Sequence, residues 1–600
     1  MRHQCHRNNQ ERQKHEDSPH ASEHECQPLI KQRILHTSPR IQTSGRLYSN
    51  QLPINPGNPL VVHLPMKLFK NSVPFVAVFL IVGENACGEQ HAVEGEPIIS
   101  SVTIVRQNVF DLSDDKENYT LYRWANQLHI MTRESVVENQ LLFAEGDVFD
   151  KQRLEESERI LRQNSYLYDA SISSTPREDG AVDIVVTTRD VWTLTPEIDI
   201  SRSGGENRTK FGLEEDNLLG TGQRVSVSRS DDVDRVSKTF EYSGRQIGAR
   251  RFSFTLRAAD NSDGHSRLLS IVRPFYSLDA RWTAGGFIYD DERRSTLYDL
   301  GNAVAEFQHE RENHNLFAGW SRGLHNGWVK RWTLGVAYDD NRFSSPPAPT
   351  LPVAIPTDRK LVYPYIGFEV LENQFEKSAN SDQIERSEDF YFGKRVGALL
   401  GWSDESIGAD RDALIYSLTL SNGLGSMNAR ALLLTADLRG RHEDGSAANT
   451  TLGLNARYYS RQSDKRVFFA TLDATAADNL DLDNPLEIGG DTGLRGYPLR
   501  YQSGSGRVLV TVEQRFFTDW YPWRLFRVGG ALFVDAGRVY GDNPLGGENL
   551  GWLTDVGFGF RFAPTRLGTR KMLHLDIAFP LDGDPSIDSV QVLLEIKRSF

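Results

Sequence analysis

Apolar and polar residues alternate one by one from about Thr193 to the C-terminus. In "RRFSFTLRA" the side chains of Phe252, Phe254 and Leu256 share one face, and "DVGFGFRF" and "MLHLDIAF" repeat this pattern further on. A period of two is typical of β-strands that have one apolar face. Such segments recur about every 20 residues between polar stretches of uneven length, as in transmembrane β-barrels. The pattern therefore predicts a membrane all-β barrel over residues 193–600.

A soluble β-propeller is the competing fold for this region. It would show a repeated blade, and the sequence contains no such repeat. The composition looks soluble, with 39% hydrophobic and 25% charged residues, but a barrel with alternating strands and long charged loops produces the same average. No apolar run approaches the about eighteen residues that a membrane-spanning helix requires.

Residues 97–192 follow a different pattern, which predicts a small α/β domain. "IISSVTIVRQNVF" is typical of a strand, and "TRESVVENQLLF" has the spacing of a helix with Thr132 as its expected N-cap. A second helix is expected to begin after Asp150 as its N-cap and to bury Leu154, Leu161 and Ile160. The segments "YLYDASISS" and "AVDIVVTTRD" are expected to be two strands joined by a turn. The predicted order is β-α-α-β-β.

The segment before this domain has the layout of a secretory signal peptide at residues 66–88. Basic residues follow Met66, an apolar run extends from Val73 to Val82, and small residues around Cys87 offer a cleavage site. We expect a mature chain that begins near Glu89. Lipidation of Cys87 is the alternative.

Residues 1–65 are polar and rich in His, and we interpret them as disordered or as an upstream extension of the translated sequence. All three cysteines, Cys5, Cys26 and Cys87, lie at or before the expected cleavage site. A mature chain without thiols cannot form wrong disulfides in an oxidising compartment such as the periplasm.

The sequence offers little to suggest catalysis. No close-spaced pairs of Cys and His with zinc-ligand spacing occur, and no metal site is predicted. The glycine fragments "GTGQ" and "GSGR" lack the strand-to-helix context of a phosphate-binding loop, so no cofactor is predicted. The net charge of −13 argues against a nucleic-acid partner. We therefore do not expect an enzyme.

The predicted order of elements in residues 97–192 resembles a POTRA module, the periplasmic domain attached to outer-membrane assembly and secretion barrels. The segments "EGDVFD" and "LEESERILRQNSYLYDASI" carry the resemblance, whereas "DDKENYTLYRWANQ" departs from it as an insertion after the first strand. The resemblance implies that the module captures peptides by adding a strand to an exposed sheet edge. A passive spacer is the alternative.

Two further segments resemble the BamA/TamA superfamily of assembly and translocation barrels. "LEIGGDTGLRGY" is similar to the family's extracellular-loop motif, with Arg495, Gly496 and Tyr497 in its core, and "DNLLGTGQ" is similar to its early-barrel segment. The resemblance implies a barrel of about sixteen strands in the outer membrane, preceded by one POTRA domain in the periplasm. It also implies that the loop folds back into the lumen, where Arg495 meets acidic groups of late strands.

Two late strands carry candidate partners for Arg495. In "RVLVTVEQRFF" outward valines alternate with inward residues, and Glu513 is one of the inward ones. In "GGALFVDAGRV" outward Leu and Val alternate with Phe533 and Asp535. The pleat therefore points the side chains of Glu513, Phe533 and Asp535 into the barrel. The resemblance implies that Arg495 pairs with Asp535 and Glu513 while Phe533 packs beside it. A guanidinium suits this task because it is planar, always charged and can hold two carboxylates. We expect a latch that fixes the late strands.

The chain ends in "VQVLLEIKRSF", in which Val592, Leu594, Ile596 and Phe600 are expected to share one face with Val590. Alternation that ends at a C-terminal Phe resembles the β-signal of outer-membrane barrels, with Ile596 and Phe600 as its members.

The family resemblance implies a protein that inserts, assembles or translocates other proteins at the outer membrane without nucleotide hydrolysis. The expected partners are unfolded outer-membrane or secreted proteins, outer-membrane lipids, and periplasmic or inner-membrane proteins. A two-partner secretion pore for one dedicated protein is one alternative, although its relatives usually carry two POTRA modules. A passive outer-membrane channel is another, but it would need no POTRA domain.

Overall fold

The computed structural model describes residues 96–600 apart from residues 247, 569 and 586. The expected signal peptide at 66–88 and the polar residues 1–65 lie outside the described residues. None of the helices in this described part is both long and apolar enough to cross a membrane.

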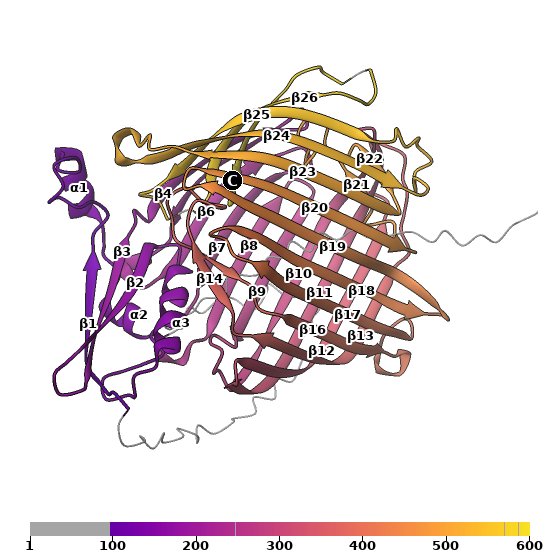
Figure 1. The fold of residues 1–600 in the computed structure, drawn as a ribbon. Helices are drawn as coiled ribbons and strands as arrows, with labels where there is room; N and C mark the ends of the chain where they lie inside the picture. Colours follow the sequence, from indigo (N-terminus) through magenta and orange to yellow (C-terminus); the bar gives the residue numbers. More distant parts are fainter. Residues whose placement is uncertain (1–95, 247, 569, 586) are drawn as a thin grey trace, which may run out of the picture. The chain divides into compact units, whose positions relative to one another are not determined.

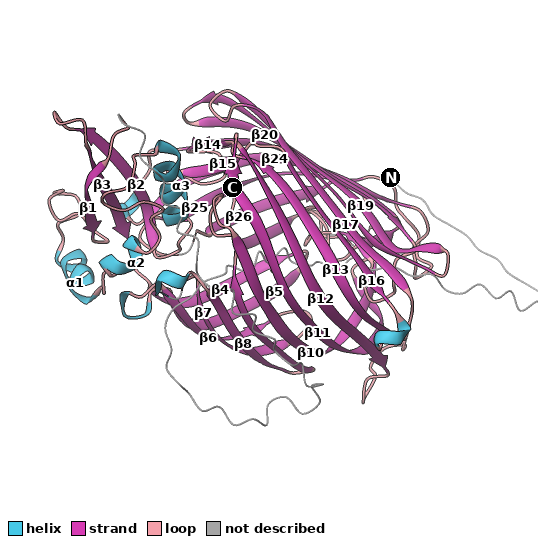
Figure 2. Ribbon diagram, turned by 90° about the horizontal axis from the view of Figure 1, so that it is seen from below, coloured by secondary structure: helices cyan, strands magenta, loops and turns pink. Residues whose placement is uncertain are grey.

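The N-terminal domain holds a three-stranded sheet and three helices. The sheet has the order β1-β3-β2, in which β1 is parallel to β3 and β2 is antiparallel to it. Figure 2 shows that the helices gather in this domain, while the rest of the described chain is nearly all strand and loop. The elements in chain order are β1 (Ile99–Gln107), α1 (Thr120–Leu128), α2 (Glu134–Glu138), α3 (Lys151–Arg162), β2 (Leu167–Pro176) and β3 (Val182–Asp190).

Helix α2 has Arg133 and not Thr132 at its N-cap position, because the Thr132 hydroxyl donates to Asp190 at 2.9 Å instead. Helix α3 forms as the sequence predicts. The Asp150 side chain accepts a hydrogen bond from the Gln152 backbone N–H at 2.9 Å and so caps the helix. Leu154 and Leu161 are buried in one core with Tyr166 of the following loop, whereas Ile160 is only half-buried. Helix α1 is an addition to the predicted β-α-α-β-β order, and it lies within the insertion that follows the first strand.

The remaining chain forms a closed antiparallel β-barrel (Figure 1). It has 20 strands in the structure, so the expected number of about sixteen is wrong. That number came from the family resemblance, and the alternating pattern does not fix how many segments join the barrel. The strands are β4 (Leu194–Ser203), β5 (Glu206–Glu215), β6 (Gln223–Asp231), β7 (Val236–Gly244), β8 (Ser253–Asn261), β9 (Gly264–Arg273), β10 (Trp282–Asp299), β11 (Asn302–His325), β12 (Trp328–Ser344), β13 (Arg359–Glu372), β16 (Arg395–Ser403), β17 (Ala413–Gly425), β18 (Arg430–Glu443), β19 (Ser446–Ser463), β20 (Arg466–Asp478), β23 (Gly506–Phe517), β24 (Phe526–Tyr540), β25 (Leu553–Pro564), β26 (Met572–Pro580) and β27 (Gln591–Lys597).

The two faces of the barrel wall differ as a lipid-facing barrel requires. On β24 and β25 the outward side chains of Leu532, Val534 and Phe558 are exposed, whereas the inward Phe533 and Arg561 are buried. Outward apolar residues on a closed wall are suited to lipid, and this architecture fits an outer-membrane barrel.

Two short hairpins stand apart from the wall. Strand β14 (Phe375–Ser378) pairs with β15 (Glu388–Tyr391), and β21 (Leu486–Ile488) pairs with β22 (Gln502–Gly504). We call the end of the barrel at which β4 begins, next to the N-terminal domain, the proximal end and the opposite end the distal end. Because the strands alternate in direction, the β14–β15 hairpin belongs to the proximal end and the β21–β22 hairpin to the distal end.

The barrel closes at one thin seam. The last strand, β27, pairs with the first, β4, through a single Cα partnership between Leu594 and Arg202. The neighbouring ladders are continuous: β26 pairs with β27 from Met572 to Ala578, and β4 pairs with β5 along all of Leu194–Ser203. Most backbone groups of β4 and β27 that face the seam therefore have no ladder partner across it. All the remaining pairs of neighbouring barrel strands in the described chain are joined by longer ladders.

Candidate functional site

The distal loop between β20 and β23 folds back into the barrel. Leu494, Tyr497 and Tyr501 of this loop are buried in one apolar cluster with Leu509 and Val539 of the wall. The cluster holds the loop against the inner face of the late strands.

Two glycines allow the loop to approach the wall. Gly493 has a φ of 126°, a backbone conformation that side-chain-bearing residues rarely adopt. A Cβ on Gly496 would lie 2.7 Å from the Cβ of Asp555, so only glycine fits there. The sequence around Arg495 thus serves to bring one side chain close to the lumen wall.

Arg495 lies in the lumen and contacts carboxylates of two strands. Its Nε and Nη2 donate to the two carboxylate oxygens of Asp535 at 2.7 and 2.9 Å, and its Nη1 donates to Glu513 at 2.9 Å. The guanidinium carbon lies 3.4 Å from the centre of the Phe533 ring, and Thr511 donates to Asp535 at 2.7 Å. The structure therefore brings Arg495, Glu513, Phe533 and Asp535 together in one buried cluster, which we call the distal latch.

The loop backbone and Tyr497 extend the distal latch to a third strand. The Gly496 N–H donates to Asp555 at 2.9 Å. The Tyr497 hydroxyl donates to the Thr554 carbonyl at 2.8 Å and accepts from the Thr554 N–H at 2.9 Å. Sequence reasoning missed Asp555, although the pleat of "DVGFGFRF" places it on the lumen face opposite the outward phenylalanines. The loop thus spans β23, β24 and β25.

A chain of charges continues from the distal latch toward the proximal end. Arg515, two residues along β23 from Glu513, donates to Glu513 at 2.9 Å. It also donates to Asp382 at 3.0 Å and to the Ser381 carbonyl at 2.8 Å. Glu513 therefore lies between Arg495 and Arg515 and connects the two halves of the lumen.

Asp382 belongs to the segment that joins β14 to β15, which sequence reasoning missed. Ile384 and Phe390 of this segment are buried in one cluster with Phe469, Phe517 and other inward residues of the wall. We call residues 375–391 the proximal hairpin. The only sequence signal was a long polar stretch between two barrel strands, which looks like any other loop.

The carboxylate of Glu388 holds the turn of the proximal hairpin. It accepts hydrogen bonds from the backbone N–H groups of Ser381 and Asp382, each at 3.0 Å. Burial, together with the nearby Asp382 carboxylate, raises the pKa of Glu388 to about 8, and the backbone donors only partly oppose this shift.

The C-terminal residue corrects another expectation. Strand β27 ends at Lys597, and Phe600 does not share the outward face of Val592. It is buried, its ring centre lies 4.9 Å from that of Phe517, and its N–H donates to the Asp382 carbonyl at 2.8 Å. Contacts with the proximal hairpin therefore hold Phe600 inside the barrel after β27 has ended. A strand that continued to the C-terminus would have placed Phe600 on the outer face. Ile596 remains in β27, opposite Leu573 of β26.

The proximal hairpin also contacts the N-terminal domain. Arg162 of α3 donates to the two oxygens of Asp389 at 2.8 and 2.5 Å. Arg386 donates to the Leu167 carbonyl at 2.9 Å, at the start of β2. The hairpin therefore connects the N-terminal domain with the lumen.

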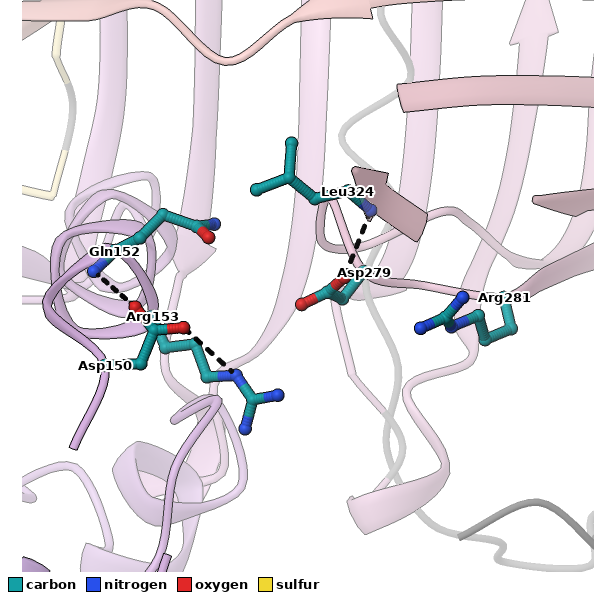
Figure 3. A pocket seen from close by; sticks show the side chains of 6 residues that line it. All are labelled: Asp150, Gln152, Arg153, Asp279, Arg281 and Leu324. Atoms are coloured by element: carbon teal, nitrogen blue, oxygen red, sulfur yellow. Dashed lines mark hydrogen bonds and ion pairs between the residues drawn. The ribbon is translucent and has the colours of Figure 1, made fainter. Parts of the chain in front are cut away.

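A separate cavity of about 420 Å³ lies between α3 and the proximal turns, as Figure 3 shows. Its lining is polar, and several of its charged groups already have partners within it. Asp150 caps α3, and the Asp279 carboxylate accepts from the Leu324 N–H at 3.1 Å. The remaining lining residues are Gln152, Arg153 and Arg281. None of these six lining residues belongs to the distal latch.

Comparisons with known proteins bear on both parts of the chain. The POTRA family, described as "Surface antigen variable number repeat", matches residues 129–189. No curated protein sequence matches the chain. A POTRA domain followed by a closed barrel is the arrangement predicted from the BamA/TamA resemblance, and this arrangement is confirmed.

Three solved structures are similar to the chain, each over 84% of its length. CdiB from Escherichia coli has 13% identity, a TM-score of 0.45 and 77% of its own chain covered. CdiB from Acinetobacter baumannii has 13% identity, a TM-score of 0.43 and 74% covered. BamA from Haemophilus ducreyi, lacking POTRA domains 1–3, has 11% identity, a TM-score of 0.37 and 85% covered.

Proposed function

We propose that this BamA/TamA-like protein, a POTRA domain followed by a β-barrel, assists the insertion and assembly of other proteins in the outer membrane of a Gram-negative bacterium. In this proposal the proximal end and the POTRA domain face the periplasm. The distal loop that carries Arg495 faces the cell exterior.

The observation that carries the proposal is the thin seam between β27 and β4. Unpaired backbone N–H and C=O groups are costly in lipid, because no water is present to satisfy them. A client strand that pairs with β4 or β27 would satisfy these groups and would bury its own apolar face in lipid. Opening the seam therefore requires the loss of few hydrogen bonds and offers the client a template.

The distal latch supports the same proposal. It joins β23, β24 and β25 and so stabilises the late strands. The loop that carries it also touches the distal end of β4, where Ser203 donates to the Gly490 carbonyl at 3.4 Å. The rest of the wall can then stay intact while β27 and β4 separate. Arg495, Gly496, Tyr497, Glu513, Phe533 and Asp535 act in this proposal as a structural latch.

The POTRA domain would supply the client. Its sheet order β1-β3-β2 leaves β1 and β2 as outer strands, and the start of β2 is already contacted by the proximal hairpin through Arg386. The second half of β2, from Ser171 to Pro176, is largely exposed and has no partner strand other than β3 among the described residues. An unfolded chain could add a strand to this edge.

A two-partner secretion pore is the alternative, and it would use the lumen. The distal loop and the proximal hairpin both occupy that lumen in this structure, so both would have to leave before a polypeptide passes. Lateral opening at the seam requires neither movement. We therefore place assembly before export.

The test is a reversible covalent lock across the seam. Arg202→Cys with Leu594→Cys joins the single Cα pair between β4 and β27 among the described residues. The control, Ile198→Cys with Phe211→Cys, joins partners within the continuous β4–β5 ladder. Both pairs are placed in a background in which the natural cysteines are replaced by serine.

In proteoliposomes, the oxidised seam lock should stop the folding of a urea-unfolded client barrel, and reduction should restore it. The control lock should leave client folding unchanged. Full activity with the seam locked would contradict lateral insertion.

Depletion of the protein should also lower the folded amounts of several outer-membrane proteins. Loss of a single exported protein would instead favour the secretion pore, and no change would favour a passive channel.

A further inference from the structure

The insertion in the POTRA domain carries an exposed apolar stripe. Leu121, Trp124 and Leu128 of α1 lie three and four residues apart, so they share one face of the helix. Their exposed fractions are 68%, 61% and 74%. Large apolar side chains on one exposed face indicate a surface that normally meets another apolar phase.

The opposite face of α1 is already satisfied within the domain. The Tyr122 ring stacks on Phe110 at 4.1 Å between ring centres. The Asn126 side chain accepts from the Phe110 N–H at 3.0 Å and donates to its carbonyl at 2.8 Å. The helix is therefore fixed in orientation, and its apolar stripe is not the face that holds it to the domain.

Several contacts attach the insertion to the proximal end of the barrel. The Tyr122 hydroxyl donates to the carbonyl of Trp523, in the turn between β23 and β24. Arg566, in the turn after β25, pairs with Glu117 and donates to the Val109 carbonyl at 2.7 Å. Arg524 lies 3.6 Å from Asp114. These contacts fix α1 beside the ends of strands whose outer faces meet lipid.

The turn that α1 contacts carries aromatic side chains of its own. Trp520 and Trp523 are exposed, Trp523 by 75%. They follow β23 and precede β24, whose outward Leu532 and Val534 are also exposed. Tryptophan at strand ends is typical of the girdle that marks the membrane interface of a barrel. The apolar stripe on α1 and the exposed Trp520 and Trp523 therefore lie near each other at the proximal end of the barrel.

We propose that α1, with Trp520 and Trp523, lies in the headgroup region of the membrane leaflet at the proximal end and anchors the N-terminal domain to the lipid surface. Leu121, Trp124 and Leu128 enter the leaflet, while Arg123 and Gln127 on the neighbouring polar side remain in the headgroups, as in an interfacial amphipathic helix. The partner is phospholipid. The anchor depends on the barrel being in a membrane and not on the identity of its client.

The test uses the full chain in phospholipid vesicles. The three cysteines are replaced by serine, and Leu128→Cys carries an environment-sensitive NBD dye. Ile98→Cys is the matched control, because Ile98 is also an exposed apolar residue of this domain but lies before β1, whereas the insertion follows that strand. Leu121→Cys serves as a second labelled position if labelling at 128 disturbs the fold.

The dye at 128 should emit at shorter wavelength than the dye at 98 and should lose intensity in vesicles with brominated acyl chains. Dye at 98 should keep the emission of an aqueous site with no quenching. Retained heat-modifiable mobility of the barrel in SDS gels verifies folding of each variant. Aqueous emission at both 128 and 121 in a folded protein would overturn the proposal. A blue-shifted emission that brominated lipid does not quench would also overturn it, because another part of the protein would then cover the apolar stripe.

Discussion

Arg495→Ala should strongly destabilise the barrel. The substitution removes three charge-assisted hydrogen bonds, two to Asp535 and one to Glu513, and leaves both carboxylates buried. Removal of one partner from a buried ion pair costs about 3–5 kcal/mol. Here Asp535 loses its counter-ion, whereas Glu513 keeps its hydrogen bond from Arg515 at 2.9 Å. We expect the free energy of unfolding to fall by that amount.

Urea titration of the reconstituted protein, followed by the mobility of unheated samples in SDS gels, measures this change. Arg500→Ala is a matched control in the same loop, because Arg500 also makes two hydrogen bonds to one carboxylate, that of Asp234, but the pair is more exposed. Solvent screens this partly exposed pair more than the buried Arg495 cluster, so the control should lose less stability than Arg495→Ala.

A double-mutant cycle separates the ion pair from the packing of the loop. Arg495→Ala and Asp535→Ala, alone and together, should give a coupling energy of about 1–3 kcal/mol. A coupling energy near zero, or an Arg495→Ala variant no less stable than Arg500→Ala, would refute the latch. Arg495 would then be an ordinary turn residue between glycines.

Three further predictions concern other parts of the chain. The mature protein should begin near Glu89, which N-terminal sequencing checks; a mature chain that retains the polar residues before 66 would contradict the signal peptide. Replacement of the proximal hairpin, residues 375–391, by a short Gly-Ser turn should raise the conductance in planar bilayers because the hairpin fills the lumen; unchanged conductance would exclude that role. Glu388 has a raised pKa of about 8 against 4.5 in the unfolded chain, so its neutral form favours the docked hairpin and this stability is lost as pH rises through that range. Trypsin should therefore cut the hairpin faster at about pH 9 than at about pH 6, and Glu388→Gln should remove this difference; equal pH dependence in both proteins would rule the carboxyl out.

Local patterns were sufficient for the parts of this protein that depend on neighbouring residues. Alternation with a period of two identified the barrel region, because successive side chains of a strand point to opposite faces. The same pleat indicated that Glu513, Phe533 and Asp535 face the lumen, and the structure has them there in contact with Arg495. The capping of α3 by Asp150 was equally local.

Contacts between distant segments could not be found in this way. The number of strands depends on which segments pair around the whole circumference, and a polar stretch such as residues 375–391 carries no signal that it enters the lumen. Phe600 was expected on the outer face, and it turns inward only because Asp382, Ile384 and Phe517 form a site for it. The seam is likewise a property of the closed barrel.

The sequence by itself determined the outward apolar face of strands such as β24 and β25, where the α/β domain lies, and which charged residue the distal loop carries. Only the tertiary structure decided that 20 strands close the barrel, that Glu513 joins Arg495 to Arg515, and that a second hairpin enters from the proximal end. The physical reason is the distance along the chain between the residues that interact. Pleat and helix periodicity are set by residues a few positions apart, whereas barrel closure and lumen contacts are set by register and packing between strands that can be hundreds of residues apart.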